Sequence, residues 1–381
     1  MWLTSSSVGR KFIMALTGIC LVLFVTFHCL MNSIAIVWPA AYNVICEFLG
    51  ANWYALIASM GLALLFIIHI IYAVWLTVMN RKARGNDRYL INKTPKAVEW
   101  SSKNMLVLGI VILAFLVVHL IQFWAKMQLE EVLGHHGTVP AAAGTLFIQE
   151  AFKEIWTPIV YIIGFVALWF HMTHGFWSMF QSIGWDSTAW IPRWKKIGDW
   201  WTSIVVALFV AQAVVFFVQS QKDYYSTQPE LQSQYIEMAV APLNETLPML
   251  NMPSDMQTVK MTMAQIAPQA DMMLGMMKMQ MPGVDIQAVG QQMLNIVNLV
   301  NYLDPTANLP VEALQRAADG QTQQPQMPQM MGQPQAQPQA QPQEAPQGEP
   351  QQVSPEQQAA DDAPAQEPAN PNDKQKETSI N

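Results

Sequence analysis

Residues 156–182 read WTPIVYIIGFVALWFHMTHGFWSMFQS, a run without a single Asp, Glu, Lys or Arg. A helix needs about 20 apolar residues to cross a hydrocarbon core about 30 Å thick, and a charge at its centre costs several kcal/mol. Four further stretches share this character, and the five predicted spans are about 12–37, 53–79, 104–126, 156–182 and 199–220. The pattern predicts an all-α membrane protein built on a bundle of five transmembrane helices.

The charges divide the chain into two parts of different composition. Residues 1–220 hold 14 Lys/Arg and 9 Asp/Glu, whereas residues 221–381 hold 6 and 18. The first part is the predicted five-helix domain. In the second, residues 221–318 are Met-rich with short amphipathic patterns, and residues 319–381 are Gln/Pro-rich and acidic, which is typical of disorder. We therefore expect a largely disordered tail, and the net charge of −7 gives no basis for nucleic-acid binding.

Basic residues gather in the connections on one side of the predicted bilayer. Arg10 and Lys11 precede the first span, residues 80–103 carry seven Lys/Arg, and residues 193–196 carry three. Loops rich in Lys and Arg stay in the cytoplasm. We therefore expect a cytoplasmic N-terminus and an extracytoplasmic chain after residue 220.

Most of the histidines lie inside predicted spans, where an ionisable side chain must be paired or bound to a metal. The spans hold His28, His69, His119, His171 and His174, and a loop expected to be solvated holds His135 and His136. At about 1.5 Å per residue, His28 and His119 lie at matching depths toward the outside. His69 and His171 match nearer the cytoplasm. From spacing alone, His174 remains an alternative to His171.

Two imidazoles at one depth are the axial ligands that a six-coordinate haem b needs. Each gives one ring nitrogen to the iron, and its other N–H is held by a helix carbonyl or a side chain. Iron with both axial positions closed transfers electrons and leaves no position open to oxygen. The pattern therefore predicts two haems b at different depths. Gly18, Gly109 and Gly164 suit either a porphyrin edge or plain helix packing.

At these residues the sequence resembles the five-helix, di-haem cytochrome b membrane anchor (b558 type) of succinate dehydrogenase and fumarate reductase. The resemblance covers residues 1–220 and rests on SSSVGRKFIMALTG (5–18), HMTHGFWSMFQSIGW (171–185) and one His in each of the first four spans. The family places a Gly four residues after its fourth-span ligand, which favours His171 over His174. The resemblance also implies a distal haem on His28 and His119 and a proximal haem on His69 and His171.

The resemblance implies a respiratory complex II in a bacterial inner membrane. A flavoprotein with FAD would interconvert succinate and fumarate, and an iron–sulfur protein would carry electrons to this anchor and its membrane quinone. FAD and the iron–sulfur clusters would lie only on these partner subunits, docked on the cytoplasmic connections 81–103 and 185–198. This chain has no dicarboxylate site. We expect menaquinone as the quinone and complexes that can pair as a homodimer.

Candidate quinone residues are Glu47, Asn43 and Trp53, at the outer end of the second span, because quinone chemistry needs a proton acceptor near the ring. Each is equally well explained as a solvated loop residue. Candidate partners for haem propionates are Arg10, Lys11 and Ser178.

Two other functions fit the same composition. One is the cytochrome b subunit of another quinone-linked complex, a hydrogenase or a formate dehydrogenase. The other is a haem-free transporter whose intramembrane histidines relay protons. Bound haem would distinguish either cytochrome b from the transporter. The identity of the partner subunits would distinguish the anchor of succinate dehydrogenase or fumarate reductase from the cytochrome of a hydrogenase or formate dehydrogenase.

Overall fold

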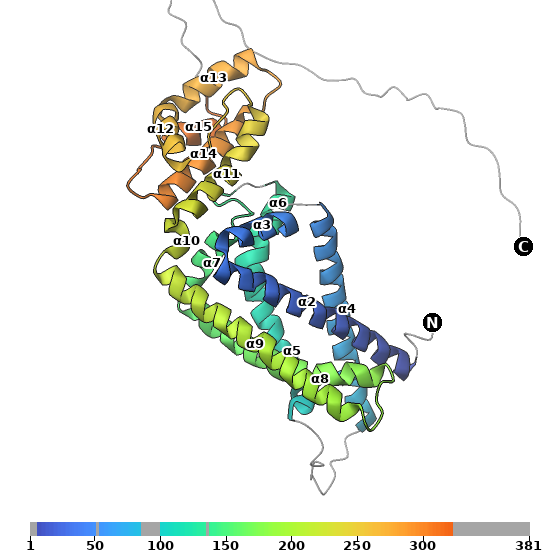
Figure 1. Ribbon diagram of the computed structural model, residues 1–381. Coiled ribbons are helices and arrows are strands. Elements are labelled where there is room, and N and C mark those ends of the chain that lie inside the picture. The colour runs from blue at the N-terminus through green and yellow to red at the C-terminus, as the bar shows by residue number, and fades with distance from the viewer. Residues whose placement is uncertain (1–5, 51–52, 85–99, 135–136, 323–381) are drawn as a thin grey trace, which may run out of the picture. The chain divides into compact units, whose positions relative to one another are not determined.

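The computed structural model describes residues 6–50, 53–84, 100–134 and 137–322, and every regular element within these ranges is a helix (Figure 1). Five helical segments are long and apolar enough to cross a membrane. They are α2 (Ser7–Val37), α4 (Trp53–Arg84), α5 (Trp100–His119) with its continuation, α8 (Trp156–Ser182) and α9 (Ile191–Gln221). The predicted five long apolar helices are therefore confirmed.

The ends of these helices follow local chemistry. The Ser6 side chain caps α2 by accepting a hydrogen bond from the Gly9 amide at 2.9 Å. Pro39 follows Trp38 and favours an extended backbone there, so α2 ends at Val37. Gly184 has a φ of +90°, a conformation that suits glycine, in the turn after α8. Several helices run beyond the predicted spans because Lys and Arg continue a helix readily outside the apolar core.

The third long segment changes from an α-helix to a π-helix partway along its length. The π-helix η1 (Leu120–Leu129) begins directly after His119 and leads into α6 (Glu130–Leu133). A π-helical segment is rare and is frequently found at functional sites. The change of winding thus falls next to one of the intramembrane histidines.

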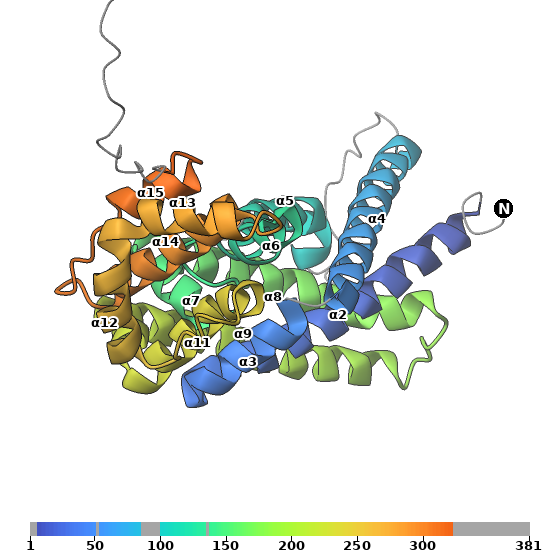
Figure 2. The same ribbon diagram turned by 90° about the horizontal axis from the view of Figure 1, so that it is seen from above.

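Two shorter helices, α3 (Pro39–Gly50) and α7 (Gly144–Phe152), lie between the long ones where the sequence analysis expects only connections. Eight of the nine residues of α7 are buried. Helix α7 packs against α3 and α9, and α8 packs against α2, α5 and α9 (Figure 1 and Figure 2). Helix α4 contacts α2 most closely and buries none of its apolar window.

Residues 224–318 are largely helical, as their amphipathic patterns allow, so this part of the tail is not disordered. They form α10 (Tyr224–Thr227), α11 (Pro229–Thr246), α12 (Met256–Ile266), the short η2 (Ala267–Gln269), α13 (Ala270–Gln280), α14 (Ile286–Leu303) and α15 (Glu312–Ala318). Met263, Leu274, Met293 and Leu314 are fully buried among them. On each helix, apolar residues three and four apart form an apolar face, and these faces are buried against those of the neighbouring helices. The predicted disorder of 319–381 falls almost entirely outside the described residues.

An ion pair ties α12 to the end of α14 in this helical domain. Lys260 Nζ donates to Asp304 Oδ2 at 2.6 Å, and Thr306 also donates to the Asp304 carboxylate. These hydrogen bonds lower the pKa of Asp304 to about 2. A carboxyl whose pKa is lowered on folding stabilises the fold above its unfolded pKa of about 3.9, and this contribution is lost as the pH falls toward 2.

We therefore expect Asp304→Asn to lower the unfolding free energy of the helical domain at pH 7 by about 1 kcal/mol, a value reduced for solvent screening. At pH 2 the variant and the wild type should become equally stable. The unfolding free energies of the variant and the wild type at pH 7 and pH 2 can be measured by urea titration, followed by the methionine methyl NMR signals of the buried Met263 and Met293. A difference that persists unchanged at pH 2 would contradict the assignment.

Candidate functional site

Four histidines from four neighbouring long helices meet in two pairs. His28 of α2 and His119 of α5 have ring centres 5.8 Å apart, with planes at 83°. His69 of α4 and His171 of α8 have ring centres 6.3 Å apart, with planes at 63°. These are the two pairs that the depth argument predicts. His174 lies one turn further along α8 and packs edge-on against Trp177 at 5.0 Å.

Thr17 holds the His69 ring from α2. Its hydroxyl lies 3.0 Å from His69 Nδ1 and 3.0 Å from the carbonyls of both Ile13 and Met14. When the hydroxyl donates to a carbonyl, its oxygen accepts the Nδ1–H of His69. That arrangement leaves Nε2 of His69 unprotonated, as a metal ligand must be.

Tyr161 of α8 holds the His119 ring in the same way. Its hydroxyl lies 3.2 Å from His119 Nδ1 and donates to Gln122 Oε1 at 2.9 Å. The tyrosine oxygen therefore accepts the Nδ1–H of His119, and Nε2 again carries the lone pair. Gln122 in turn donates to Thr157 at 3.2 Å, so the whole chain of side chains is held in place.

The two remaining histidines are held differently. His28 Nε2 lies 3.1 Å from the Asn32 amide nitrogen, and Asn32 accepts from the Tyr42 hydroxyl at 3.1 Å. Asn32 must therefore rotate away before His28 Nε2 can bind a metal. His171 Nδ1 is buried and has no hydrogen-bond partner among the described residues. A buried polar atom without a partner is costly, which makes His171 the least satisfied of the four rings.

The pair geometry can be tested against a haem held by two axial imidazoles. A metal–nitrogen bond of about 2 Å on each side of the iron sets the two ring centres about 6 Å apart. The observed separations of 5.8 and 6.3 Å match this spacing. The residues present therefore fit two bis-imidazole haems b.

Two glycines near the pairs have different surroundings. A Cβ on Gly18 would lie 3.9 Å from His69 Cε1, so this glycine faces the histidine. A Cβ on Gly164 would lie only 2.5 Å from the Phe115 ring. Gly164 therefore allows close packing of α5 on α8, the plain packing role that the sequence left open for it.

The predicted cationic partner Arg10 lies near the start of α2. Its guanidinium stacks over the Trp75 ring at 5.1 Å, and its Nε is buried without a hydrogen-bond partner among the described residues. Ser178 contributes no bond toward the histidines in the contacts described, and its carbonyl accepts from Ser182 at 2.9 Å. His135, His136 and residues 85–99 of the predicted docking connection lie outside the described residues.

The three predicted quinone residues do not come together. Asn43 is fully buried: it accepts from the Thr145 amide at 3.0 Å and hydroxyl at 2.8 Å, and it donates to Gln234 at 2.9 Å. Glu47 is exposed on α3, and Trp53 is 75% exposed at the start of α4.

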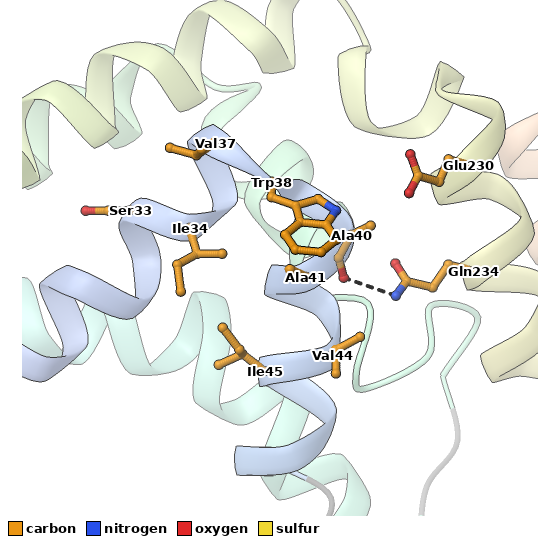
Figure 3. Close-up of a pocket in the computed structure, with 10 residues that line it drawn as sticks. All are labelled: Ser33, Ile34, Val37, Trp38, Ala40, Ala41, Val44, Ile45, Glu230 and Gln234. Atoms are coloured by element: carbon orange, nitrogen blue, oxygen red, sulfur yellow. Dashed lines mark hydrogen bonds between the residues drawn. The ribbon is translucent and has the colours of Figure 1, made fainter.

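A pocket does open beside α3, but its polar wall comes from Glu230 and Gln234 of α11 (Figure 3). Sequence reasoning missed both residues. They lie almost two hundred positions from their neighbours on α2 and α3, and no local pattern marks them.

The assignment of a function to these residues rests on their own geometry. The histidine pairs, with Thr17 and Tyr161 behind them, are the most specific arrangement within the described residues. No family model, curated protein or solved structure matches this chain.

Proposed function

We propose that this chain is the haem-bearing membrane anchor and electron-transfer subunit of a succinate:quinone oxidoreductase. The observation that carries the proposal is the pair of facing histidines at each of two places, with separations of 5.8 and 6.3 Å, on four helices long enough to span a membrane. Its resemblance over residues 1–220 to the di-haem anchors of succinate dehydrogenase and fumarate reductase supports the same conclusion.

Each histidine pair would hold one haem b, and the bound haem supplies reversible one-electron chemistry at iron. The chain's own residues do the rest. His28 and His119 would hold one haem, and His69 and His171 the other. Thr17 and Tyr161 keep His69 and His119 in the tautomer that presents Nε2. With two histidines on each iron, the bound group would supply electron transfer and not oxygen activation.

The sidedness follows from the charge pattern of the sequence. With the basic connections in the cytoplasm, the N-terminus lies inside and the helical domain after residue 222 lies outside. The resemblance implies that the membrane is a bacterial inner membrane. The flavoprotein and iron–sulfur partners bind on the cytoplasmic side and carry FAD and the clusters. The membrane quinone exchanges electrons with the haems of this chain.

A reduced-minus-oxidised absorption spectrum of the purified full-length chain tests the proposal. We expect the bands of low-spin haem b and about two haems per chain. Co-purification with a flavin-containing chain and an iron–sulfur chain that oxidise succinate would separate this function from a hydrogenase or formate dehydrogenase cytochrome. A chain that binds no haem would overturn the proposal and favour a transporter.

The two supporting hydroxyls provide a finer prediction. Tyr161→Phe and Thr17→Val keep the shape of each side chain but remove the acceptor for the Nδ1–H of His119 or His69. Loss of such a partner typically weakens metal binding by about 10- to 100-fold and makes the imidazole less basic.

A less basic ligand stabilises ferric iron less, so the midpoint potential of the affected haem should rise. Redox titration of each variant, with haem content measured in parallel, checks this. We expect Tyr161→Phe to alter one haem and Thr17→Val the other. A change in the same haem from both variants would contradict the pairing.

A further inference from the structure

A pocket of about 780 Å³ lies along the end of α2 and one face of α3 (Figure 3). Its wall on these two helices is apolar and includes Ile34, Val37, Ala41 and Val44. The opposite wall carries the only ionisable side chain of the lining, Glu230, together with Gln234. An apolar slot with a few placed polar groups is the usual form of a small-molecule site.

The polar wall is held in position by buried hydrogen bonds. Gln234 Nε2 donates to the Ala40 carbonyl at 3.1 Å, and Gln234 Oε1 accepts from Asn43 Nδ2 at 2.9 Å. An amide nitrogen carries two hydrogens, so Gln234 can also donate to a ligand oxygen. Figure 3 shows the Glu230 carboxylate one turn away, on the same side of α11.

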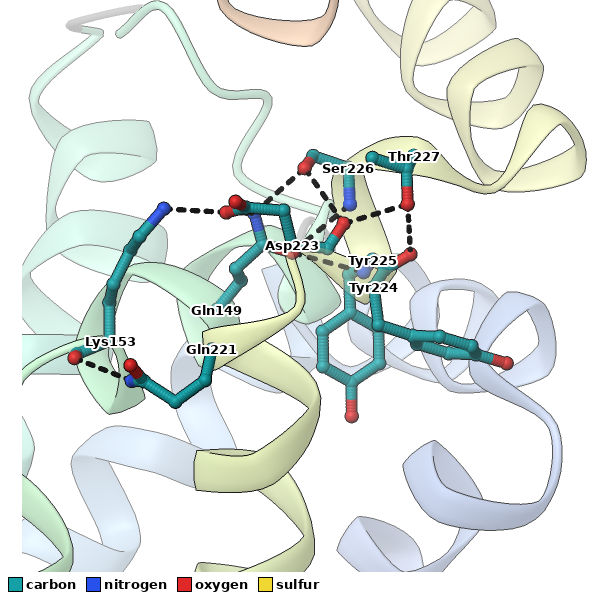
Figure 4. A network of polar contacts seen from close by, with 8 residues as sticks. All are labelled: Gln149, Lys153, Gln221, Asp223, Tyr224, Tyr225, Ser226 and Thr227. Atoms are coloured by element: carbon teal, nitrogen blue, oxygen red, sulfur yellow. Dashed lines mark hydrogen bonds and ion pairs between the residues drawn. The ribbon is translucent and has the colours of Figure 1, made fainter.

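A second network fixes the chain just before Glu230 (Figure 4). Gln149 Oε1 accepts from the amides of Tyr225 at 3.0 Å and Ser226 at 3.1 Å, at the start of α10. Lys153 Nζ pairs with Asp223 at 2.5 Å, a bond that raises the pKa of Lys153. Gln221 donates to the Lys153 carbonyl at 2.8 Å. The segment just before Glu230 is therefore hydrogen-bonded to α7 and to Lys153, which directly follows α7. Glu230 faces the pocket from the end of this segment.

The pocket also lies close to a histidine pair. Ile34 follows His28 by six residues on the same helix, a rise of about 9 Å. Asn32 connects His28 to Tyr42 of α3, the helix that forms the pocket wall. A redox-active ring in the pocket would therefore lie within a few helical turns of the His28–His119 pair.

These features favour a quinone over other apolar occupants. An acyl chain needs neither a carboxylate nor an oriented amide, and Glu230 disfavours an anionic lipid headgroup by charge repulsion. A quinone is neutral, apolar in its ring and tail, and carries two oxygens that accept a hydrogen bond or a proton.

We propose that the helical domain after the fifth span forms one wall of a quinone-headgroup site, in which Gln234 binds a quinone oxygen and Glu230 exchanges protons with it. This inference rests on the proposed function. Reduction of one quinone to its quinol takes two electrons and two protons. The electrons would be supplied one at a time by the haem that the His28–His119 pair would hold under the proposed function. Both protons come from water at the pocket mouth through the Glu230 carboxyl, and oxidation of a quinol reverses these transfers.

Equilibrium binding of a menaquinone with one isoprene unit to the purified full-length chain tests the site. Ala41→Phe fills the pocket and should weaken binding at least tenfold, whereas Leu49→Phe, on the same helix outside the lining, should not. Glu230→Gln keeps the hydrogen bonds but not the proton exchange. It should leave binding within about twofold and slow quinone turnover about tenfold or more. Glu237→Gln, an exposed carboxyl two turns along α11, is its matched control and should change neither.

Equal quinone binding by Ala41→Phe and Leu49→Phe would overturn the site, as would displacement of the quinone by excess phosphatidylethanolamine in nanodiscs. Wild-type turnover in Glu230→Gln would overturn the proton role. Haem content is measured in every sample so that the two proposals can be tested separately. If the chain binds two haems but Ala41→Phe binds the quinone as tightly as the wild type, only the pocket is refuted. A chain without haem refutes the proposed function, and the binding comparison can still be read.

Discussion

Replacing His28 or His119 with alanine is expected to remove one haem b, and the same haem in both variants. Replacing His69 or His171 should remove the other. Under the proposed function each ring would supply one of the two protein bonds to a haem iron, and its partner 5.8 or 6.3 Å away could not hold the haem alone. Haem content should fall from about two to about one per chain, as measured by the pyridine haemochrome assay.

The matched control is His174→Ala, because His174 lies on the same helix as His171 but packs against Trp177. It should keep both haems. The two haems can be told apart by redox titration, since they occupy sites with different supporting side chains. If His28→Ala and His119→Ala removed different haems, the pairing across α2 and α5 would be wrong.

The second large effect concerns the junction of α3, α7 and α11. Asn43→Leu is expected to destabilise it by about 3 kcal/mol, because a buried group left without its partner costs about 1–3 kcal/mol. The change removes the acceptor for the Thr145 amide and hydroxyl and the donor to Gln234. Hydrogen exchange of the α10 and α11 amides should become about a hundredfold faster, since about 1.4 kcal/mol corresponds to tenfold.

Gln291→Leu is the matched control for this experiment. Its amide nitrogen donates to the nearby Asn295 on the exposed surface of α14, at 2.9 Å. We expect little change in exchange from its loss, because exposed side-chain bonds contribute little. Unaltered exchange in Asn43→Leu would mean that the apolar contacts hold α11 without the buried amide network.

The long helices could be predicted from the sequence because the property that defines them is local. About 20 consecutive apolar residues must form a helix in lipid, since the hydrocarbon core offers no partner for backbone N–H and C=O groups. The spacing of each histidine from the charged end of its helix is also local. The depth argument therefore pairs the same histidines that the structure brings together, and their binding of iron stays a prediction.

The tail shows where such reasoning is weaker. The sequence predicted short amphipathic helices in 221–318 but not that they pack together, and residues 229–318 pack around buried Met263, Leu274 and Met293. Each helix there is short, and its apolar face gains stability only when several helices cover one another. No single window of sequence contains that information.

By itself, the sequence determined the five apolar helices and the heights of their histidines, since both follow from the composition and rise of a single helix. Spacing alone left His171 and His174 open and the resemblance favoured His171; the tertiary structure places His171 against His69, because the rotation of a helix is set by what packs on each side. It also decided which groups Thr17, Tyr161, Asn43 and Gln234 bind. Their partners lie tens to nearly two hundred residues away, and only packing brings them within bonding distance.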